Sequence, residues 1–361
     1  MSTYPGSGIL TQFYGPLAEA TYGVAPTLTG AHFYAIKGGE SLKGKKITAE
    51  GQGLFSGALH PQAGRRVLTG WEAGGGVSME LPTRNLQQWL FPMFGSYGQA
   101  KSALTEDGAT LAYSSVHAPG PLQTHSFVVQ KGVPSVDGTV LPSTLTGCKI
   151  TDWDLSVAKH GIAELAITIM ARNELLGAGN SDPLNVAVPA LVTYSPPIGG
   201  VFHWAEASLY TGGTCSTTLG VTSVSAPVKS ANVRNVSIKY TIPLDGDRYE
   251  MGGAGFRSEP IDNGLRTITV SFEVEWLSSA AMYNAYAADT PTALELTLIG
   301  PSIGSGSDFS TLTILVPEMF FDGEPPDIAG TQVVTQKIVM AGLDDAANNV
   351  IQATYWTLDA T

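Results

Sequence analysis

The residues that could perform chemistry fall into a few short clusters. The glycines Gly39 and Gly44, followed by Lys45, match most of a loop that cradles nucleotide phosphates. Such a loop also needs Ser or Thr after the lysine and a helix whose N-terminus faces the phosphates. Here position 46 is Lys, and residues 46–50 have the pattern of a strand. We therefore interpret this segment as a basic loop between strands.

A second cluster is the nucleophile-like run Gly300-Pro-Ser302-Ile-Gly304. The Gly-x-Ser-x-Gly elbow exposes its serine on a sharp turn between a strand and a helix. A strand can precede this run, but Gly304-Ser-Gly-Ser-Asp308 and another strand follow it. The context favours a hairpin loop, and a hydrolase that uses Ser302 is the third and last function that we retain.

The carboxylates, histidines and cysteines form no catalytic or metal-ligand pattern. Asp152 and Asp154 alternate with apolar residues on one strand, and so do Glu273 and Glu275. Acids in such positions are ordinary solvated side chains of a half-buried strand. The histidines show no metal-ligand spacing; they are His32, His60, His117, His125, His160 and His203. The sequence predicts no catalytic residue, no metal site and no cofactor.

The two cysteines, Cys148 and Cys215, are too few for a disulfide framework. We interpret them as thiols of a reducing compartment. The N-terminus shows no signal peptide, and no apolar run approaches the 18 residues that a membrane helix needs.

The elements that hold these residues follow one pattern that is written twice. In the first copy, the strand 76–81 leads through Pro82 into a helix at 83–94. In the second copy, the strand 265–276 leads into a helix at 278–288. Apolar residues at helical spacing predict the packing face of each helix; they are Leu86, Trp89 and Leu90 in the first and Met282, Tyr283 and Tyr286 in the second.

Strict alternation of apolar and polar residues predicts most of the other strands. The clearest case is 267–276, and a hairpin is predicted at 148–171, closed by Lys159-His160-Gly161 with Gly161 in positive φ. A turn-rich stretch is expected after the first helix, up to about residue 122. The sequence predicts a mainly β fold with two tandem modules, each a β-sandwich or barrel with a flanking α-helix.

Composition supports a packed protein with a surface that suits contacts between copies. Of the 361 residues, 43% are hydrophobic and only 14% are charged, which is well below the usual quarter. The net charge is −12, with 12 Lys and Arg against 13 acids in residues 1–200 and 7 against 18 in residues 201–361. Such a balance argues against tight binding of nucleic-acid phosphates.

Breaks in these patterns divide the chain. Residues 1–30, rich in Gly, Pro, Ser and Thr, are expected to form an extended N-terminal arm. Residues 31–175 form the first predicted module, 176–200 a linker rich in Gly and Pro, and 201–361 the second module.

These segments resemble the tail tube proteins of bacteriophages with long, non-contractile tails. The resemblance is carried by Ala18-Glu-Ala-Thr-Tyr-Gly23 with Pro26, the strand–helix run 76–95, the hairpin 148–173, and the stretches 207–213 and 233–276. It implies tail-tube-like modules that join into rings, with the rings stacked into a hollow tube through which DNA passes without specific binding. Most relatives carry one module and form hexamers, so two modules imply trimeric rings with pseudo-sixfold symmetry.

The resemblance also implies partners and a place in the cell. The chain would associate with itself, the tape-measure protein and the tail terminator, and with no membrane. It would assemble in the host cytoplasm and end up in the tail of the virion. We expect Glu80, Glu273 and Glu275 to face the lumen, where acids discourage adsorption of DNA.

The alternative function is a β-rich baseplate or adhesin module that binds a host surface glycan. Such sites expose aromatic side chains in loops. Here Trp71, Trp153, Trp204 and Trp276 lie within strand patterns, where packing is the ordinary role.

Overall fold

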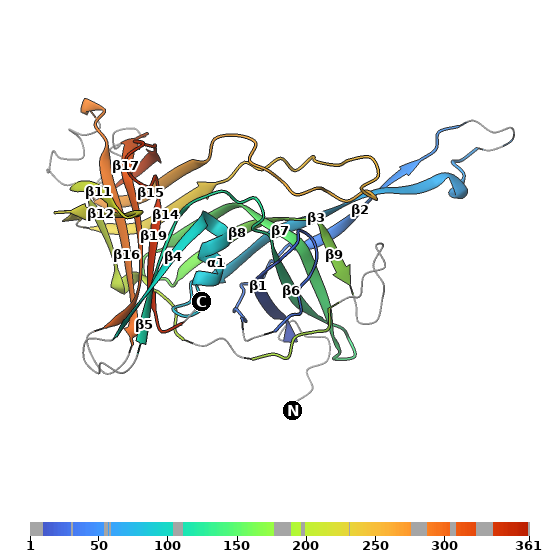
Figure 1. Ribbon diagram of the computed structural model, residues 1–361, viewed down its shortest axis with the longest axis horizontal. Helices are drawn as coiled ribbons and strands as arrows, with labels where there is room; N and C mark the ends of the chain where they lie inside the picture. Colours follow the sequence, from blue (N-terminus) through green and yellow to red (C-terminus); the bar gives the residue numbers. More distant parts are fainter. Residues whose placement is uncertain are drawn as a thin grey trace.

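A computed structural model describes most of the chain. The described residues are 10–29, 32–53, 57, 59–103, 111–176, 189–195, 199–230, 232–275, 287–303, 308–322 and 335–359. The mainly β prediction is confirmed, since antiparallel strands dominate this part of the protein (Figure 1). The described strands form one large open sheet and a small two-stranded sheet, and they do not close into a barrel.

The strands of the N-terminal half, residues 10–176, surround the α-helix α1 (Gln87–Phe94). They are β1 (Gln12–Ala18), β2 (Lys43–Glu50), β3 (Arg66–Glu80), β4 (Gly95–Ala103), β5 (Leu111–Pro119), β6 (Phe127–Pro134), β7 (Val140–Val157), β8 (Ala163–Ala171) and β9 (Asn173–Leu176). In the C-terminal half, residues 199–359, the strands are β10 (Ala207–Thr211), β11 (Thr214–Thr218), β12 (Val221–Ser225), β13 (Val228–Lys229), β14 (Val233–Thr241), β15 (Thr267–Glu275), β16 (Thr292–Ser302), β17 (Phe309–Phe321), β18 (Thr335–Gly342) and β19 (Gln352–Thr357). Short 3₁₀ turns, η2 (Ala63–Arg65) and η3 (Trp204–Glu206), precede β3 and β10.

The strand pairings of the two halves recur in the same order. In the N-terminal half the pairs are β1–β6, β2–β3, β3–β8, β6–β7, β7–β8 and β7–β9. In the C-terminal half the corresponding pairs are β10–β16, β14–β15, β15–β18, β16–β17, β17–β18 and β17–β19. The N-terminal half has the hairpin β4–β5 as an addition to this pattern.

Seven strands form one continuous layer across both halves, in the spatial order β2, β3, β8, β7, β14, β15 and β18. We call it the seven-strand layer. One of its faces is buried, because alternate residues such as Val77, Ile167, Leu155, Ile238 and Phe272 are apolar and almost fully covered. The other face carries polar side chains.

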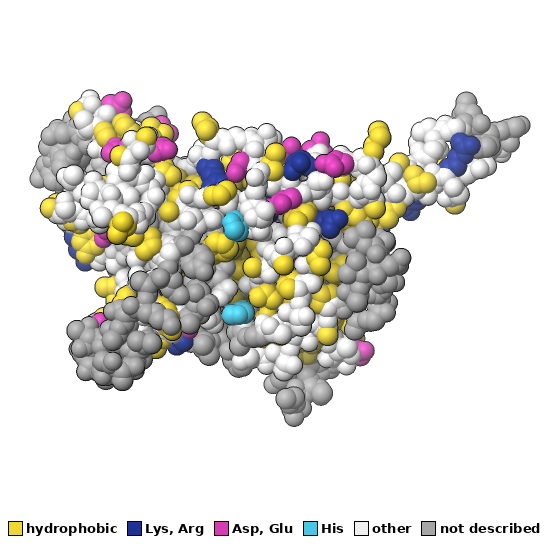
Figure 2. All heavy atoms as spheres, in the orientation of Figure 1, with side chains coloured by type: hydrophobic (Ala, Val, Ile, Leu, Met, Phe, Trp, Pro, Cys, Tyr) yellow, Lys and Arg dark blue, Asp and Glu magenta, His cyan; other side chains and the backbone are white. Residues whose placement is uncertain are grey.

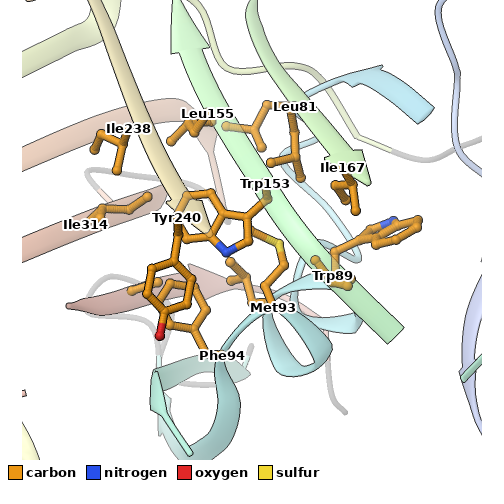
Figure 3. Packing of buried hydrophobic residues seen from close by; sticks show 14 of the residues in the cluster. Leu81, Trp89, Met93, Phe94, Trp153, Leu155, Ile167, Ile238, Tyr240 and Ile314 are labelled. Carbon is orange, nitrogen blue, oxygen red and sulfur yellow. The ribbon is translucent and has the colours of Figure 1, made fainter. Parts of the chain in front are cut away.

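Helix α1 packs on the buried face of this layer. Phe94 lies 5.5 Å from Trp153 of β7 and 6.3 Å from Tyr240 of β14, measured between ring centroids. Figure 3 shows these rings converging with Met93 of the helix between the strands. The helix thus contributes to a core that spans both halves of the chain.

The helix begins later than the sequence pattern indicated. It starts at Gln87 rather than residue 83, and no side chain caps its N-terminus. Asn85 has a φ of 61°, a left-handed conformation that cannot continue a helix. The Thr83 hydroxyl does not cap the helix; it donates to the carbonyl of Gly200 and accepts the backbone N–H of Gly200.

Three further expectations need correction. The segment expected to be turn-rich holds strands β4 and β5. The described part of the predicted N-terminal arm contains β1, which pairs with β6. In the β7–β8 turn, His160 rather than Gly161 adopts the positive φ, at 58°.

Candidate functional site

The polar face of the seven-strand layer gathers most of the carboxylates that the sequence singled out. Its described charged residues include Glu72, Glu80, Asp152, Asp154, Glu164, Glu273 and Glu275, with Lys37, Lys43, Lys45, Arg234, Lys239 and Lys337. These seven acids and six bases nearly balance, and the bases of β2 lie toward the protruding hairpin. None of these side chains is fully buried, so all of them are accessible to solvent.

Each predicted acid has a defined neighbour on this face. Glu80 lies opposite Glu164 of β8, and Glu164 accepts a hydrogen bond of 2.6 Å from Lys37. Glu275 accepts a bond of 2.6 Å from Arg234, and Glu273 accepts one of 2.9 Å from Asn235.

The two aspartates of β7 join this network. Asp154 accepts a bond of 2.7 Å from Ser237 on β14, and Lys239 lies opposite it in the ladder. The hydroxyl of Thr151 donates to Asp152 at 3.5 Å and to the backbone carbonyl of Thr168 in β8 at 3.3 Å. The arrangement is a solvent-accessible surface of paired charges.

Of the residues predicted to form the packing faces of the two helices, the structure describes only those of the first helix. Leu86, Trp89 and Leu90 are buried to 2% exposure or less. Met282, Tyr283 and Tyr286 lie outside the described residues.

The two motifs that resemble a phosphate-binding loop and a nucleophile elbow lie in strands and a hairpin. Lys45 lies in β2, and no helix follows the glycine pair at 39 and 44. Ser302 ends β16, and its hydroxyl donates to the backbone carbonyl of Asp308 in the adjoining hairpin.

Both cysteines are free thiols in the structure. Burial raises the pKa of Cys148 well above its usual value, and burial with nearby acids raises the pKa of Cys215 to about 11. Thiols with a raised pKa stay protonated and are weak nucleophiles.

Three seams join the halves of the chain. The first is the pairing of β7 with β14, in which Leu155 faces Ile238 and Trp153 faces Tyr240. Because both strands contribute to the buried and the polar face, the two halves share one core and one polar surface.

The second seam joins the β4–β5 hairpin to the C-terminal strand β19. Ser115 of β5 faces Tyr355, and the Tyr355 hydroxyl donates to the carbonyl of Thr83 at 2.7 Å. Asp359 then accepts bonds from the Arg84 side chain and the Asn85 backbone, both at 2.6 Å. The end of the chain therefore fixes the turn that precedes α1.

The third seam is the connection between β14 and β15, residues 242–266. It crosses the ends of β7 and β8 and reaches β3, as Figure 1 shows. There Trp71 donates its backbone N–H to Gly255, and its ring stacks on Phe256 at 6.1 Å. No local sequence pattern predicts this contact, because it joins residues about 180 positions apart.

A buried histidine in the second seam predicts sensitivity to acid. Burial lowers the pKa of His117 on β5 to about 3. The unfolded chain takes up this proton near pH 6.5, whereas the native chain does not, so stability falls as pH drops from 6.5 toward 3. We expect His117 to account for a loss of about 2 kcal/mol between pH 7 and pH 5.

Urea denaturation at several pH values measures this effect. The His117→Gln variant should show a shallower dependence of unfolding free energy on pH. An identical slope in both proteins would contradict the assignment of this acid sensitivity to His117.

A broad β layer with a hydrated polar face, held together by strand pairing between its halves, defines a structural β protein. The sequence model of the phage tail tube protein family matches residues 12–342. The chain belongs to this family, and the expectation from resemblance is confirmed. Its class is that of a structural component of the bacteriophage tail tube, within the virion. No curated protein matches the sequence. No helix in the described part of the chain has the length and apolar character to span a membrane.

Proposed function

We propose that the chain builds the tail tube from two tandem modules, residues 31–175 and 201–361. The recurrence of six strand pairings in the same order supports a duplicated unit. Strand β1, from the segment before residue 31, completes the first module, and residues 176–200 connect the two.

The observation that carries this proposal is the pairing of β7 with β14. It joins β7, the last strand that the first module contributes to the seven-strand layer, to β14, the first strand that the second module contributes. Strand β2 is the counterpart of β14 in the first module, and its outer edge has no described partner strand. An unpaired edge is a template for another chain, so copies can join as the modules do.

In this arrangement three copies supply six modules, which gives a ring with pseudo-sixfold symmetry. The seven-strand layers become a closed wall, and closure removes the free edges that otherwise promote aggregation. Helix α1 lies on the buried side of the layer, so the polar face turns to the bore. Glu80, Glu273 and Glu275 then line the lumen, and their negative charge keeps DNA from adhering as it passes.

Stacked rings form the hollow tube, which assembles in the host cytoplasm. The tape-measure protein occupies the growing tube and the tail terminator ends it. In this role the chain performs no catalysis and needs no cofactor.

Electron microscopy with a mass measurement of the purified protein tests this function. Rings with the mass of three chains, or tubes built from them, are the expected result. A map that places Glu80, Glu273 and Glu275 on the outer wall would reject the assignment of the bore. Monomers that bind a glycan and never assemble would favour the adhesin alternative.

A further inference from the structure

The hairpin of β2 and β3 protrudes from the body of the protein, as Figure 1 shows at the right. Its described part exposes apolar side chains that a monomer would ordinarily cover. Leu59 is 94% exposed, Val67 is 54% exposed and Leu68 is 48% exposed. The hairpin is also basic, with five Lys or Arg against two Glu in residues 43–72. These features indicate a docking element that lacks its receptor within the chain.

The register of the strands identifies the counterpart of this hairpin in the second half. Strand β3 begins its ladder with β8 at Ala73 opposite Ala171, and β15 begins its ladder with β18 at Ile268 opposite Gly342. When these ladder ends are matched, the buried residues Val77 and Met79 of β3 correspond to the buried residues Phe272 and Val274 of β15.

The same match extends to the neighbouring strands. Gly74 of β3 corresponds to Thr269 of β15. Their partners in the neighbouring strands, Lys43 of β2 and Lys239 of β14, also correspond to each other. Residues 46–71 of the hairpin therefore occupy the place of residues 242–266, with lengths that agree to within one residue.

The counterpart segment already shows how such an element docks. Residues 242–266 cover the open end of the β3–β8 ladder in the first half. Tyr249 donates its hydroxyl to Trp71 at 2.9 Å, and Arg257 donates to Ala171 at 3.2 Å. Gly255 meets Gly70 backbone to backbone, and Gly70 is buried there.

No described segment covers the equivalent ladder end in the second half, between β15 and β18. Leu265, which corresponds to Gly70, is 92% exposed, and Leu343 beside the end of β18 is 53% exposed. Counted along the chain from the matched residues Lys43 and Lys239, the residue of the hairpin that corresponds to Gly255 is Leu59. Gly70 and Gly255 are in contact at the covered end. Their counterparts, Leu265 and Leu59, are both exposed leucines.

Charge favours the same match. Three acids surround the uncovered end, and they are Glu318, Asp344 and Asp345. Burial and the proximity of Asp345 raise the pKa of Glu318, which is the response of a carboxylate in an acidic surrounding. Figure 2 shows Lys and Arg side chains on the protruding hairpin and a group of Asp and Glu side chains near the opposite end of the molecule.

We propose that the β2–β3 hairpin of one copy docks on the β15–β18 end of a second copy, with Leu59 against Leu265. This inference rests on the proposed self-assembly and names the surface that it uses. Within a ring, each junction between copies then repeats the junction between the two halves of one chain. The basic hairpin meets the acidic half of its neighbour, which orients copies head to tail.

Cysteine cross-linking between separate chains tests this contact. One chain carries Leu59→Cys and the other Leu265→Cys, both with Cys215→Ser so that no other accessible native thiol competes. Mixing them during assembly and oxidising should give a covalent dimer on a non-reducing gel. The matched control replaces Leu265→Cys by Leu219→Cys, at a position 99% exposed on the β11–β12 turn, and should give none.

Charge variants supply a second measurement. Lys45→Glu with Arg65→Glu should slow dimer formation about tenfold at low salt, because electrostatic steering is lost. At 1 M salt the difference should disappear, since charges are then screened within about 3 Å. Lys229→Glu, which changes a charge outside the hairpin, should have a smaller effect.

The outcomes separate this inference from the proposed function. Rings that form without the Leu59–Leu265 cross-link overturn the docking site and leave the tube function intact. A cross-link that forms only in stacked tubes, and not in single rings, places the hairpin on the next ring and also overturns it. Failure of the wild-type chain to form any ring rejects the function itself.

Discussion

Replacing Glu259 by Ala is expected to lower the free energy of unfolding by about 3–5 kcal/mol, because it leaves a buried ammonium group without its counterion. Lys149 of β7 is 1% exposed, and its Nζ lies 2.7 Å from Oε1 of Glu259. The same oxygen accepts the backbone N–H of Thr124 at 2.6 Å. The carboxylate therefore holds the connection between β14 and β15 against the first half of the chain. Urea denaturation of the unassembled chain, followed by tryptophan fluorescence, measures the loss.

Two further variants make this prediction specific. Lys149→Met combined with Glu259→Ala removes both charges and should recover much of the stability, as replacement of buried ion pairs often does. The exposed pair Lys37–Glu164 has side chains 45% and 41% exposed, so Glu164→Ala should cost no more than about 1 kcal/mol. Equal losses for Glu259→Ala and Glu164→Ala would contradict a role for burial.

Trp89→Ala is expected to lower the free energy of unfolding by about 3–5 kcal/mol. The indole is fully buried on α1 and contacts rings from three other segments. Its ring lies 6.2 Å from Phe13 of β1, 5.9 Å from Tyr34 and 6.1 Å from Phe127 of β6, centroid to centroid. Truncation therefore leaves a cavity where the helix meets the sheet, and rigid neighbours fill it only in part.

The same denaturation experiment measures this change. Leu219→Ala is the control, because Leu219 is 99% exposed and its truncation should stay within about 0.5 kcal/mol. Loss of stability in the tryptophan variant should also reduce assembly, since a loosened α1 no longer supports β7 and β14. A loss below 1 kcal/mol would mean that the core closes around the missing ring.

The strands with strict alternation were predictable because their side-chain period of two is local information. Residues 267–275 form β15 with the expected buried face, and the hairpin at 148–171 lies within β7 and β8. Strand β5 gave no such signal, because Ser114, Ser115 and His117 interrupt its apolar pattern. It forms a strand because β4 and β19 pair with its two edges.

The candidate surface divides in the same way. Alternation placed Glu80, Glu273 and Glu275 opposite the apolar positions of their strands, and each lies on the polar side of the layer. Their neighbours Glu164, Arg234 and Lys337 come from other elements, so the sequence could not assign them.

By itself, the sequence determined the mainly β class, the polar and apolar faces of the best strands, and the family, since these depend on local pattern and residue type. The tertiary structure decided which edges meet, namely β7 with β14, and β5 with β19. It also decided the start of α1, because Asp359 bonds the backbone of Asn85 from the far end of the chain. Such contacts join residues tens to hundreds of positions apart, and their free energy depends on burial and geometry that no local pattern contains.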